Sequence, residues 1–269
     1  MANIGRVLVI AGSDSGGGAG IQGDIKTISA LCGYAATAIT ALTAQNTKGV
    51  FGIHDVPDDF IKQQIRLVMD DIGADCFKTG MLHKASIIKA VAECLLPHIH
   101  STPLVLDPVM FAKGGAPLLA VDALDTLKGY LIPIAEIITP NIPEAEFLSG
   151  TNIKTIADME DAATKILALG CKAVLMKGGH LEGDDLTDIL VTQDKAYHFT
   201  QPRIHTTHTH GTGCSMASAI ATGIAQKLSL YDAVVRARAY VRKAIETAPQ
   251  LGHGHGPLGH THTVKEFTA

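Results

Sequence analysis

Residues 6–32 carry the sequence RVLVIAGSDSGGGAGIQGDIKTISALC, which predicts a buried strand, a glycine-rich turn and a helix. The apolar run at 6–11 has the length of a strand, and Ile21, Ile25 and Ile28 recur at helical spacing. Further strands are predicted at 34–42, 50–56, 74–78, 103–107, 136–139 and 173–177, and further helices at 59–71, 84–96, 121–131 and 158–169. A hairpin at 188–191 and 195–199 and two helices at 212–226 and 231–248 complete the pattern.

This alternation of strands and helices indicates an α/β fold with three layers, in which helices cover both faces of a mostly parallel sheet. No linker rich in Ser, Gly or Pro divides the chain, and no repeat of 20–50 residues occurs, so we expect one domain over 1–269. In such sheets ligands bind outside the carboxyl ends of the strands. The polar residues that follow each strand are therefore the candidate site residues.

Composition excludes several classes of function. The chain has 269 residues, 46% of them hydrophobic, and a formal net charge of −4, which fits a folded protein and argues against a nucleic-acid partner. No apolar run reaches the roughly 18 residues of a membrane span, and the first residues lack a signal peptide's apolar region. The five cysteines form no Cys-x-x-Cys pair, which favours reduced thiols and a cytoplasmic location.

The glycine-rich turn at 16–20 does not match a cofactor-binding fingerprint. Ile21 stands where the third glycine of G-x-G-x-x-G belongs, and no G-x-x-x-x-G-K-[ST] occurs, so a Rossmann oxidoreductase is poorly supported. Two interpretations remain. The turn is either a flexible connection, or backbone that closes tightly over a small polar ligand, because glycine permits close approach.

The most specific motif is His210-Gly211-Thr212-Gly213-Cys214, which opens a predicted helix. Free backbone N–H groups and the positive end of the helix dipole converge there and form an anion site that suits a transferring phosphoryl group. In the first turn of this helix we expect the pKa of the Cys214 thiol to be lowered. The alternative is a glycine-rich helix start with a buried cysteine.

Four polar residues after other strands have both a structural and a functional interpretation. Asn141 and Glu144 either cap a short helix or orient magnesium-bound water. Asp107 is either a turn residue or an acid beside the metal, and Lys177 either contacts solvent or points at phosphate. The histidine-rich segment at 253–262 has no paired thiolates and no helical His-x-x-x-His spacing, so we expect no structural zinc site there.

Seven motifs taken together resemble one family. They are GSDSGGGAGIQGD at 12–24, TALTAQNT at 40–47, KTGML at 78–82, DPVM at 107–110, TPNIPEA at 139–145, LMKGGH at 175–180 and THGTGC at 209–214. In order and spacing they look like the hydroxymethylpyrimidine/phosphomethylpyrimidine kinases of thiamine synthesis, in the vitamin-kinase branch of the ribokinase superfamily. The resemblance runs from about residue 6 to the histidine-rich tail.

This resemblance implies a ribokinase-like fold and an enzyme that uses ATP and Mg²⁺ to phosphorylate a hydroxymethylpyrimidine and then its monophosphate. It implies a cytoplasmic homodimer whose subunits pair near 34–42 and 50–56. The runner-up is a pyridoxal or pyridoxine kinase, because one branch of those enzymes also carries the His-Gly-Thr-Gly-Cys loop. A ligand-binding protein without activity on the same fold is a third possibility.

The resemblance also implies a role for each site residue. The pyrimidine pocket is expected to consist of Gly12, Ala19, Asp24, Gln45, Met81 and Val109, with Asp24 and Gln45 as its polar contacts. Lys177, Asn141, Glu144 and Thr212 are expected to bind the nucleotide, and Asp107 and Glu144 the metal. Cys214 is expected to accept the substrate proton or hold charge as a thiolate, beside the anion site of Gly211, Thr212 and Gly213.

Overall fold

The computed structural model describes residues 4–112, 115, 117–120 and 122–265. Nine strands of this part form one sheet in the order β3-β2-β1-β4-β5-β6-β7-β8-β9. Their bounds are β1 Arg6–Asp14, β2 Tyr34–Asn46, β3 Gly49–Asp55, β4 Cys76–Thr79, β5 Leu104–Leu106, β6 Ile137–Ile138, β7 Ala173–Met176, β8 Asp185–Thr192 and β9 Ala196–Pro202. The six central strands, β2, β1, β4, β5, β6 and β7, are parallel to one another. At one end β3, and at the other end β8 and β9, run antiparallel to their neighbours.

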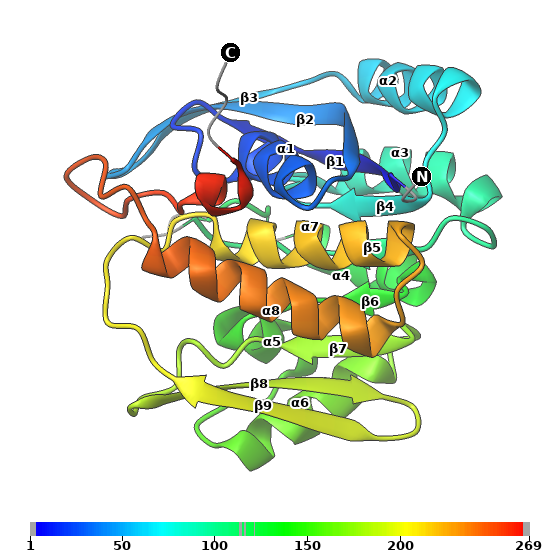
Figure 1. Ribbon diagram of the computed structural model, residues 1–269. Coiled ribbons are helices and arrows are strands. Elements are labelled where there is room, and N and C mark those ends of the chain that lie inside the picture. The colour runs from blue at the N-terminus through cyan, green and yellow to red at the C-terminus, as the bar shows by residue number, and fades with distance from the viewer. Residues whose placement is uncertain (1–3, 113–114, 116, 121, 266–269) are drawn as a thin grey trace.

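Helices connect the parallel strands and cover the sheet (Figure 1). They are α1 Gly20–Ala30, α2 Asp58–Asp71, α3 Ala85–Leu95, α4 Ala123–Tyr130, α5 Ile142–Ser149, α6 Ile156–Leu167, α7 Thr212–Ala225 and α8 Leu230–Glu246, with short 3₁₀ turns at Leu96–His98, Ile132–Ile134 and His260–Thr263. No helix among the described residues is long and apolar enough to cross a membrane.

Alternate residues of the buried strands form two separate cores, one on each face of the sheet. Val7 and Val9 of β1 pack in the cluster that includes α1, α7 and α8, whereas Leu8 and Ile10 pack in the cluster that includes α2 to α6. Successive side chains of a strand point to opposite faces, so a strand buried on both faces must be apolar throughout. This confirms the predicted three-layer α/β/α fold, and Figure 1 shows α1, α7 and α8 together on one face.

The predicted elements are confirmed to within a few residues, with two informative differences. Strand β2 continues to Asn46 instead of ending at residue 42, because β3 pairs antiparallel with its second half from Ala41 to Asn46. The β8–β9 hairpin is likewise longer than predicted, from Asp185 to Pro202. Val121, where the sequence predicts a helix to begin, lies outside the described residues.

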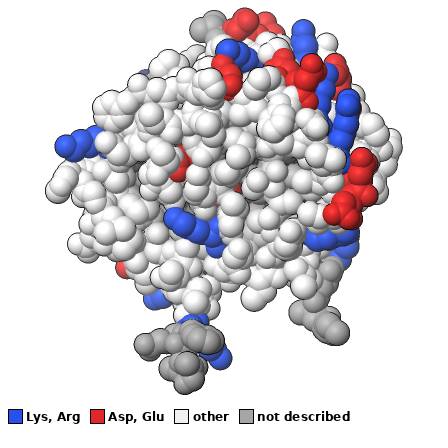
Figure 2. All heavy atoms as spheres, turned by 90° about the horizontal axis from the view of Figure 1, so that it is seen from above, with Lys and Arg blue, Asp and Glu red and all other residues white. Residues whose placement is uncertain are grey.

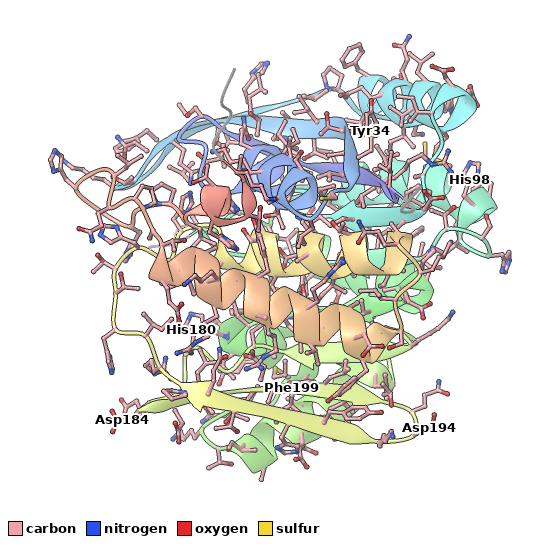
Figure 3. The ribbon with its side chains drawn as sticks, viewed as in Figure 1. Tyr34, His98, His180, Asp184, Asp194 and Phe199 are labelled. Atoms are coloured by element: carbon pink, nitrogen blue, oxygen red, sulfur yellow. The ribbon has the colours of Figure 1, made fainter. Side chains whose placement is uncertain are left out.

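The parallel strands all end on one side of the molecule, and α7 begins there. In Figure 3, His180 in the loop after β7 lies on this side together with Asp184, whereas Tyr34 at the start of β2 lies on the opposite side. The candidate residues of the sequence therefore come from one edge of the sheet.

Candidate active site

A large cavity runs along the carboxyl ends of the strands. Its volume is about 1190 Å³, and its lining includes Gln45 of β2 at one end of the sheet and Leu186 and Gln201 of β8 and β9 at the other. Pockets for single small ligands usually have about 300–1,000 Å³. The cavity therefore has room for two ligands side by side, with the α7 N-terminus among its walls.

The predicted anion site at the start of α7 depends on a close contact between two glycine-rich loops. Gly211 caps the helix with a φ of +86°, and a Cβ at this position would lie 1.9 Å from the carbonyl oxygen of Gly18. Any other residue would therefore separate the loops. No protein acceptor among the described residues binds the Gly213 or Cys214 amides, so both N–H groups are available to an anion.

Lys177 adds a positive charge to this anion site. A Cβ on Gly213 would lie 3.2 Å from Lys177 Nζ, so the ammonium group lies against the first turn of α7. Lys177 Nζ donates to Asp107 Oδ1 at 3.2 Å, and Thr139 Oγ1 donates to the same oxygen at 3.2 Å. Burial disfavours the charged lysine, but Asp107 and Glu144 raise the pKa of Lys177 above its ordinary value, so the ammonium stays protonated.

Asn141 and Glu144 form the helix cap that one of the two interpretations predicts. Asn141 Oδ1 accepts from the Glu144 amide at 3.0 Å, and Glu144 Oε2 accepts from the Asn141 amide at 2.8 Å, which is a complete capping box at the start of α5. Both residues also line the cavity. Burial raises the pKa of the Glu144 carboxyl to about 7, and Lys177 opposes this rise.

The expectation of a lowered thiol pKa at Cys214 is wrong. Burial, together with the charges of Asp24 and Asp107, raises the pKa of the Cys214 thiol to about 12, although Lys78 opposes this rise. Loss of hydration outweighs the field of the helix N-terminus here. In the protein alone the thiol is therefore neutral at pH 7, and the amides and Lys177 supply the positive potential of this site.

Five of the six residues expected in the pyrimidine pocket line the cavity. They are Gly12, Ala19, Gln45, Met81 and Val109. The sixth, Asp24, does not reach it: its side chain is fully buried, accepts from Lys78 at 2.9 and 3.0 Å, and accepts from Ser218 at 2.7 Å. A direct contact between Asp24 and substrate is therefore a wrong expectation, because the carboxylate oxygens are already engaged behind the cavity wall.

Lys78, Asp14 and the His210 side chain also line the cavity, and the sequence motifs predict no role for them. Lys78 is a charged residue in the buried strand Cys76–Thr79, and such a residue in an apolar run is a signal that could have found it. Asp14 accepts from the amides of Gly18 and Ala19 and from His210 Nε2, so it joins the two glycine-rich loops. Nothing in the local sequence indicates that long-range pair.

A cavity of this size, with its anion site between the two ends, allows a phosphoryl group to pass from one bound molecule to another, which is the arrangement of a ribokinase-like phosphotransferase. The family model described as phosphomethylpyrimidine kinase matches residues 14–259, and the chain belongs to this family. It is a kinase.

Two relatives and one solved structure show how close the similarity is. The chain is 50% identical to the bifunctional thiamine biosynthesis protein ThiED of Geobacter sulfurreducens over 95% of its own length, but it spans only 52% of that protein. It is 45% identical to the hydroxymethylpyrimidine/phosphomethylpyrimidine kinase of Bacillus subtilis, covering 95% of this chain and 94% of the relative. An ADP complex of Bacillus subtilis pyridoxal kinase has a TM-score of 0.88 and 34% identity, with 96% and 98% of the two chains covered.

Proposed function

We propose that this kinase transfers the γ-phosphoryl group of ATP to 4-amino-5-hydroxymethyl-2-methylpyrimidine and then phosphorylates the resulting monophosphate to the diphosphate, as part of thiamine biosynthesis. The observation that carries this proposal is the cavity with room for two ligands, in which Lys177 and the α7 amides converge beside the lining residues Gln45, Met81 and Val109. The name of the Bacillus subtilis relative, 45% identical over nearly the whole length of both chains, supports the choice of substrate.

In each round a bond forms between the attacking substrate oxygen and the γ-phosphorus while the bond from that phosphorus to the β,γ-bridging oxygen breaks, and ADP leaves. Lys177 and the amides of Gly213 and Cys214 hold the equatorial oxygens of the transferring group. In the first round the hydroxyl proton leaves late in a loose transition state and passes to a phosphoryl oxygen or to water, so the neutral Cys214 thiol need not act as a strong base. In the second round the attacking oxygen belongs to the ionised monophosphate and has no proton to lose.

The carboxylates of this site fit a magnesium ion. Asp107 Oδ2 receives no hydrogen bond from the described residues and lies 3.9 Å from the place of a Cβ on Gly213, so it faces the anion site. Oxygen ligands beside phosphate are the usual surroundings of Mg²⁺. Asp107 and Glu144 would hold it, directly or through water, with Asn141 beside them. The ion would neutralise charge on the phosphate oxygens.

One assay separates this function from its two competitors. Coupled ADP release is measured with hydroxymethylpyrimidine, its monophosphate and pyridoxal in turn, each with Mg²⁺ and ATP. Faster turnover of both pyrimidines than of pyridoxal is the expected result. Pyridoxal kinase is the second candidate because of the fold similarity to the Bacillus subtilis enzyme, and faster pyridoxal turnover would favour it. Absence of turnover with all three would favour a ligand-binding protein without activity.

A homodimer is the expected assembly, through the edge of the sheet at β2 and β3. Phe51, Ile53 and Leu42 of this hairpin are 72%, 36% and 46% exposed, and no strand of the described residues pairs with the outer side of β3. Figure 2, which looks down on this part of the molecule, shows a largely uncharged surface with charged side chains gathered toward one side. Light scattering should give about twice the 28.2 kDa of one chain, and Phe51→Asp should give the monomer.

The five cysteines at 32, 76, 94, 171 and 214 are all free, which supports a reducing location such as the cytoplasm. Since one sheet contains strands from Arg6 to Pro202 and α7 and α8 pack on it, a single domain is the simplest organisation. Limited proteolysis should then leave one resistant fragment.

A further inference from the structure

The side-chain amide of Gln45 lies between two groups that determine which of its atoms is the oxygen. One end of the amide, placed as Nε2, is 3.2 Å from His210 Nε2. The other end, placed as Oε1, is 3.1 Å from Thr43 Oγ1. A half turn of the amide exchanges nitrogen and oxygen without moving any other group, so the hydrogen-bond partners must decide between the two orientations.

The first partner, His210, must donate from Nε2. This nitrogen lies 2.8 Å from Asp14 Oδ2. Asp14 is an ionised acceptor, because the amides of Gly16, Gly18 and Ala19 also donate to its carboxylate. A bare Nε2 would place its lone pair against a carboxylate oxygen. The ring therefore carries hydrogen on Nε2 whether it is neutral or protonated, and this nitrogen cannot accept from a Gln45 N–H group.

The second partner, Thr43, leads independently to the same orientation. Thr43 Oγ1 lies 2.9 Å from the carbonyl oxygen of Ser13, which can only accept. The single hydroxyl proton of Thr43 is used in that bond. Toward Gln45 the hydroxyl can therefore only accept, and the amide atom that faces it must be the nitrogen.

From these two contacts we infer that Asp14 and His210 are positioning residues that fix the Gln45 amide with Oε1 toward His210 and Nε2 toward Thr43. The Gln45 backbone is held as well, since Ser15 Oγ accepts from its N–H group and donates to its carbonyl oxygen, both at 2.9 Å. The amide keeps one free lone pair and one free N–H group, and Gln45 lines the cavity. The pocket therefore presents one order of acceptor and donor to a ligand.

Resting on the proposed function, this order fits the proposed substrate, in which an amino group lies next to an unprotonated ring nitrogen. Oε1 accepts from the amino group, and Nε2 donates to the ring nitrogen. The matching oxo compound has the opposite order, with a ring N–H group and a carbonyl oxygen. Rotating the oxo compound in the pocket does not match its donor and acceptor to Gln45, because its hydroxymethyl group must still reach the α7 N-terminus. A freely turning glutamine would accept both compounds, whereas a fixed one rejects the oxo compound.

Which ring nitrogen of His210 carries hydrogen can be measured in the whole protein without any substrate. Two-bond ¹⁵N–¹H correlation spectra of ¹⁵N-histidine-labelled protein report which ring nitrogens carry hydrogen, and His210→Gln identifies the signal. We expect the His210 Nε2 signal to be that of a nitrogen that carries hydrogen, at every pH up to 8. A bare Nε2 with hydrogen only on Nδ1 would overturn the inference, even in an active kinase.

The selectivity is tested with three variants and a pair of substrates, the aminopyrimidine and its 4-oxo counterpart. His210→Met removes the ring N–H group that excludes the reversed amide, and Thr43 Oγ1 can then turn its proton from the Ser13 carbonyl oxygen to Gln45. We therefore expect the preference of this variant for the aminopyrimidine, as a ratio of kcat/KM, to fall about tenfold, with the KM for ATP unchanged. His210→Gln restores an N–H group near the position of Nε2 and should keep the preference within about threefold of the parent. The control His198→Met changes a histidine that is not part of the cavity lining, and should behave as the parent.

Each result of this experiment has one meaning. An unchanged preference in His210→Met, in folded protein, would overturn the inference while leaving the proposed function intact. Failure of the parent itself to phosphorylate either pyrimidine would overturn the proposed function and the ligand assignment. The fixed orientation of Gln45 would then be judged by the histidine spectra alone.

Discussion

Two lysine–aspartate pairs at the carboxyl ends of the sheet have the same composition and different surroundings. Lys78 is the next-to-last residue of β4 and contacts both oxygens of Asp24 at 2.9 and 3.0 Å, with both side chains fully buried. Lys177 follows β7 and contacts one oxygen of Asp107 at 3.2 Å, with 14% of its side chain exposed. We call the first pair closed, because only Lys78 borders the cavity and both oxygens of Asp24 are engaged, and the second pair open, because Lys177 and Asp107 both line the cavity.

The difference shows how one kind of contact can serve either the fold or the reaction. Ser218 completes the closed pair through a third hydrogen bond to Asp24, so these groups gain little from a ligand. In the open pair Asp107 Oδ2 has no protein donor among the described residues, and Lys177 lies against the α7 amides. Unused hydrogen-bonding capacity beside a cavity therefore distinguishes a site residue from a supporting one.

The largest effect is expected on stability, at the closed pair. Lys78→Met leaves the Asp24 charge buried without its partner, and this should lower the free energy of unfolding by about 3–5 kcal/mol. Urea-induced unfolding measures it. The double variant Lys78→Met/Asp24→Leu should recover most of the loss, because no buried charge remains. A loss below about 1 kcal/mol, typical of an exposed ion pair, would contradict the closed description.

At the open pair the expected effect is on turnover. Lys177→Met removes the charge that holds the transferring phosphoryl group and should lower kcat about 10²–10³-fold, as loss of one oxyanion-stabilising donor does. Steady-state kinetics with saturating ATP measure this, and urea unfolding of the same variant should show a smaller loss than Lys78→Met. If both lysine variants lost stability equally and Lys177→Met kept its kcat, the contrast between the pairs would be wrong.

The thiol of Cys214 lies in the field of both pairs, and its ionisation provides a third test. Because its pKa is raised to about 12, the thiolate fraction should grow about tenfold with each pH unit across pH 7–9 without reaching a plateau. The rate of iodoacetamide labelling, followed on the Cys214 peptide by mass spectrometry, should grow with it. N-acetylcysteine, with an ordinary pKa near about 8.5, should level off in the same range. A plateau below pH 8 at Cys214 would restore the base role.

Much of the fold could be predicted because its signals are local. Apolar strands such as 6–11, the helical spacing of Ile21, Ile25 and Ile28, and the capping residues Asn141 and Glu144 all act within a few residues of each other. The length of β2 could not be predicted, because its second half is stabilised by pairing with β3.

The site was only partly predictable for the same reason. The glycine-rich loops and Lys177 are visible as motifs, but Asp24 meets Lys78 across 54 residues and Asp14 meets His210 across 196. Whether a carboxylate contacts substrate or a buried lysine depends on these tertiary contacts. The pKa of the Cys214 thiol could not be predicted either. The helix start is a local feature of the sequence, whereas the burial that outweighs its field depends on tertiary packing.

The smallest expected effect concerns two capping boxes, one beside the open pair and one far from it. Asn141 and Thr155 each accept a hydrogen bond from the amide three residues on, at the starts of α5 and α6. Replacing either by Ala removes a cap and should cost about 1 kcal/mol of unfolding free energy. The two losses should be similar in urea unfolding.

The two capping variants should differ in kcat although they lose similar stability. The capping partner of Asn141 is Glu144, which lines the cavity. Asn141→Ala keeps the backbone N–H that donates to the Glu144 carboxylate but removes the Oδ1 that accepts from the Glu144 amide, so the first turn of α5 holds the carboxylate less firmly and kcat should also fall about tenfold. Thr155 and its partner Asp158 are outside the cavity lining, and Thr155→Ala should keep its kcat. Equal kcat values in the two variants would mean that Asn141 and Glu144 serve only the helix, and that the open side of the site consists of Lys177 and Asp107 without them.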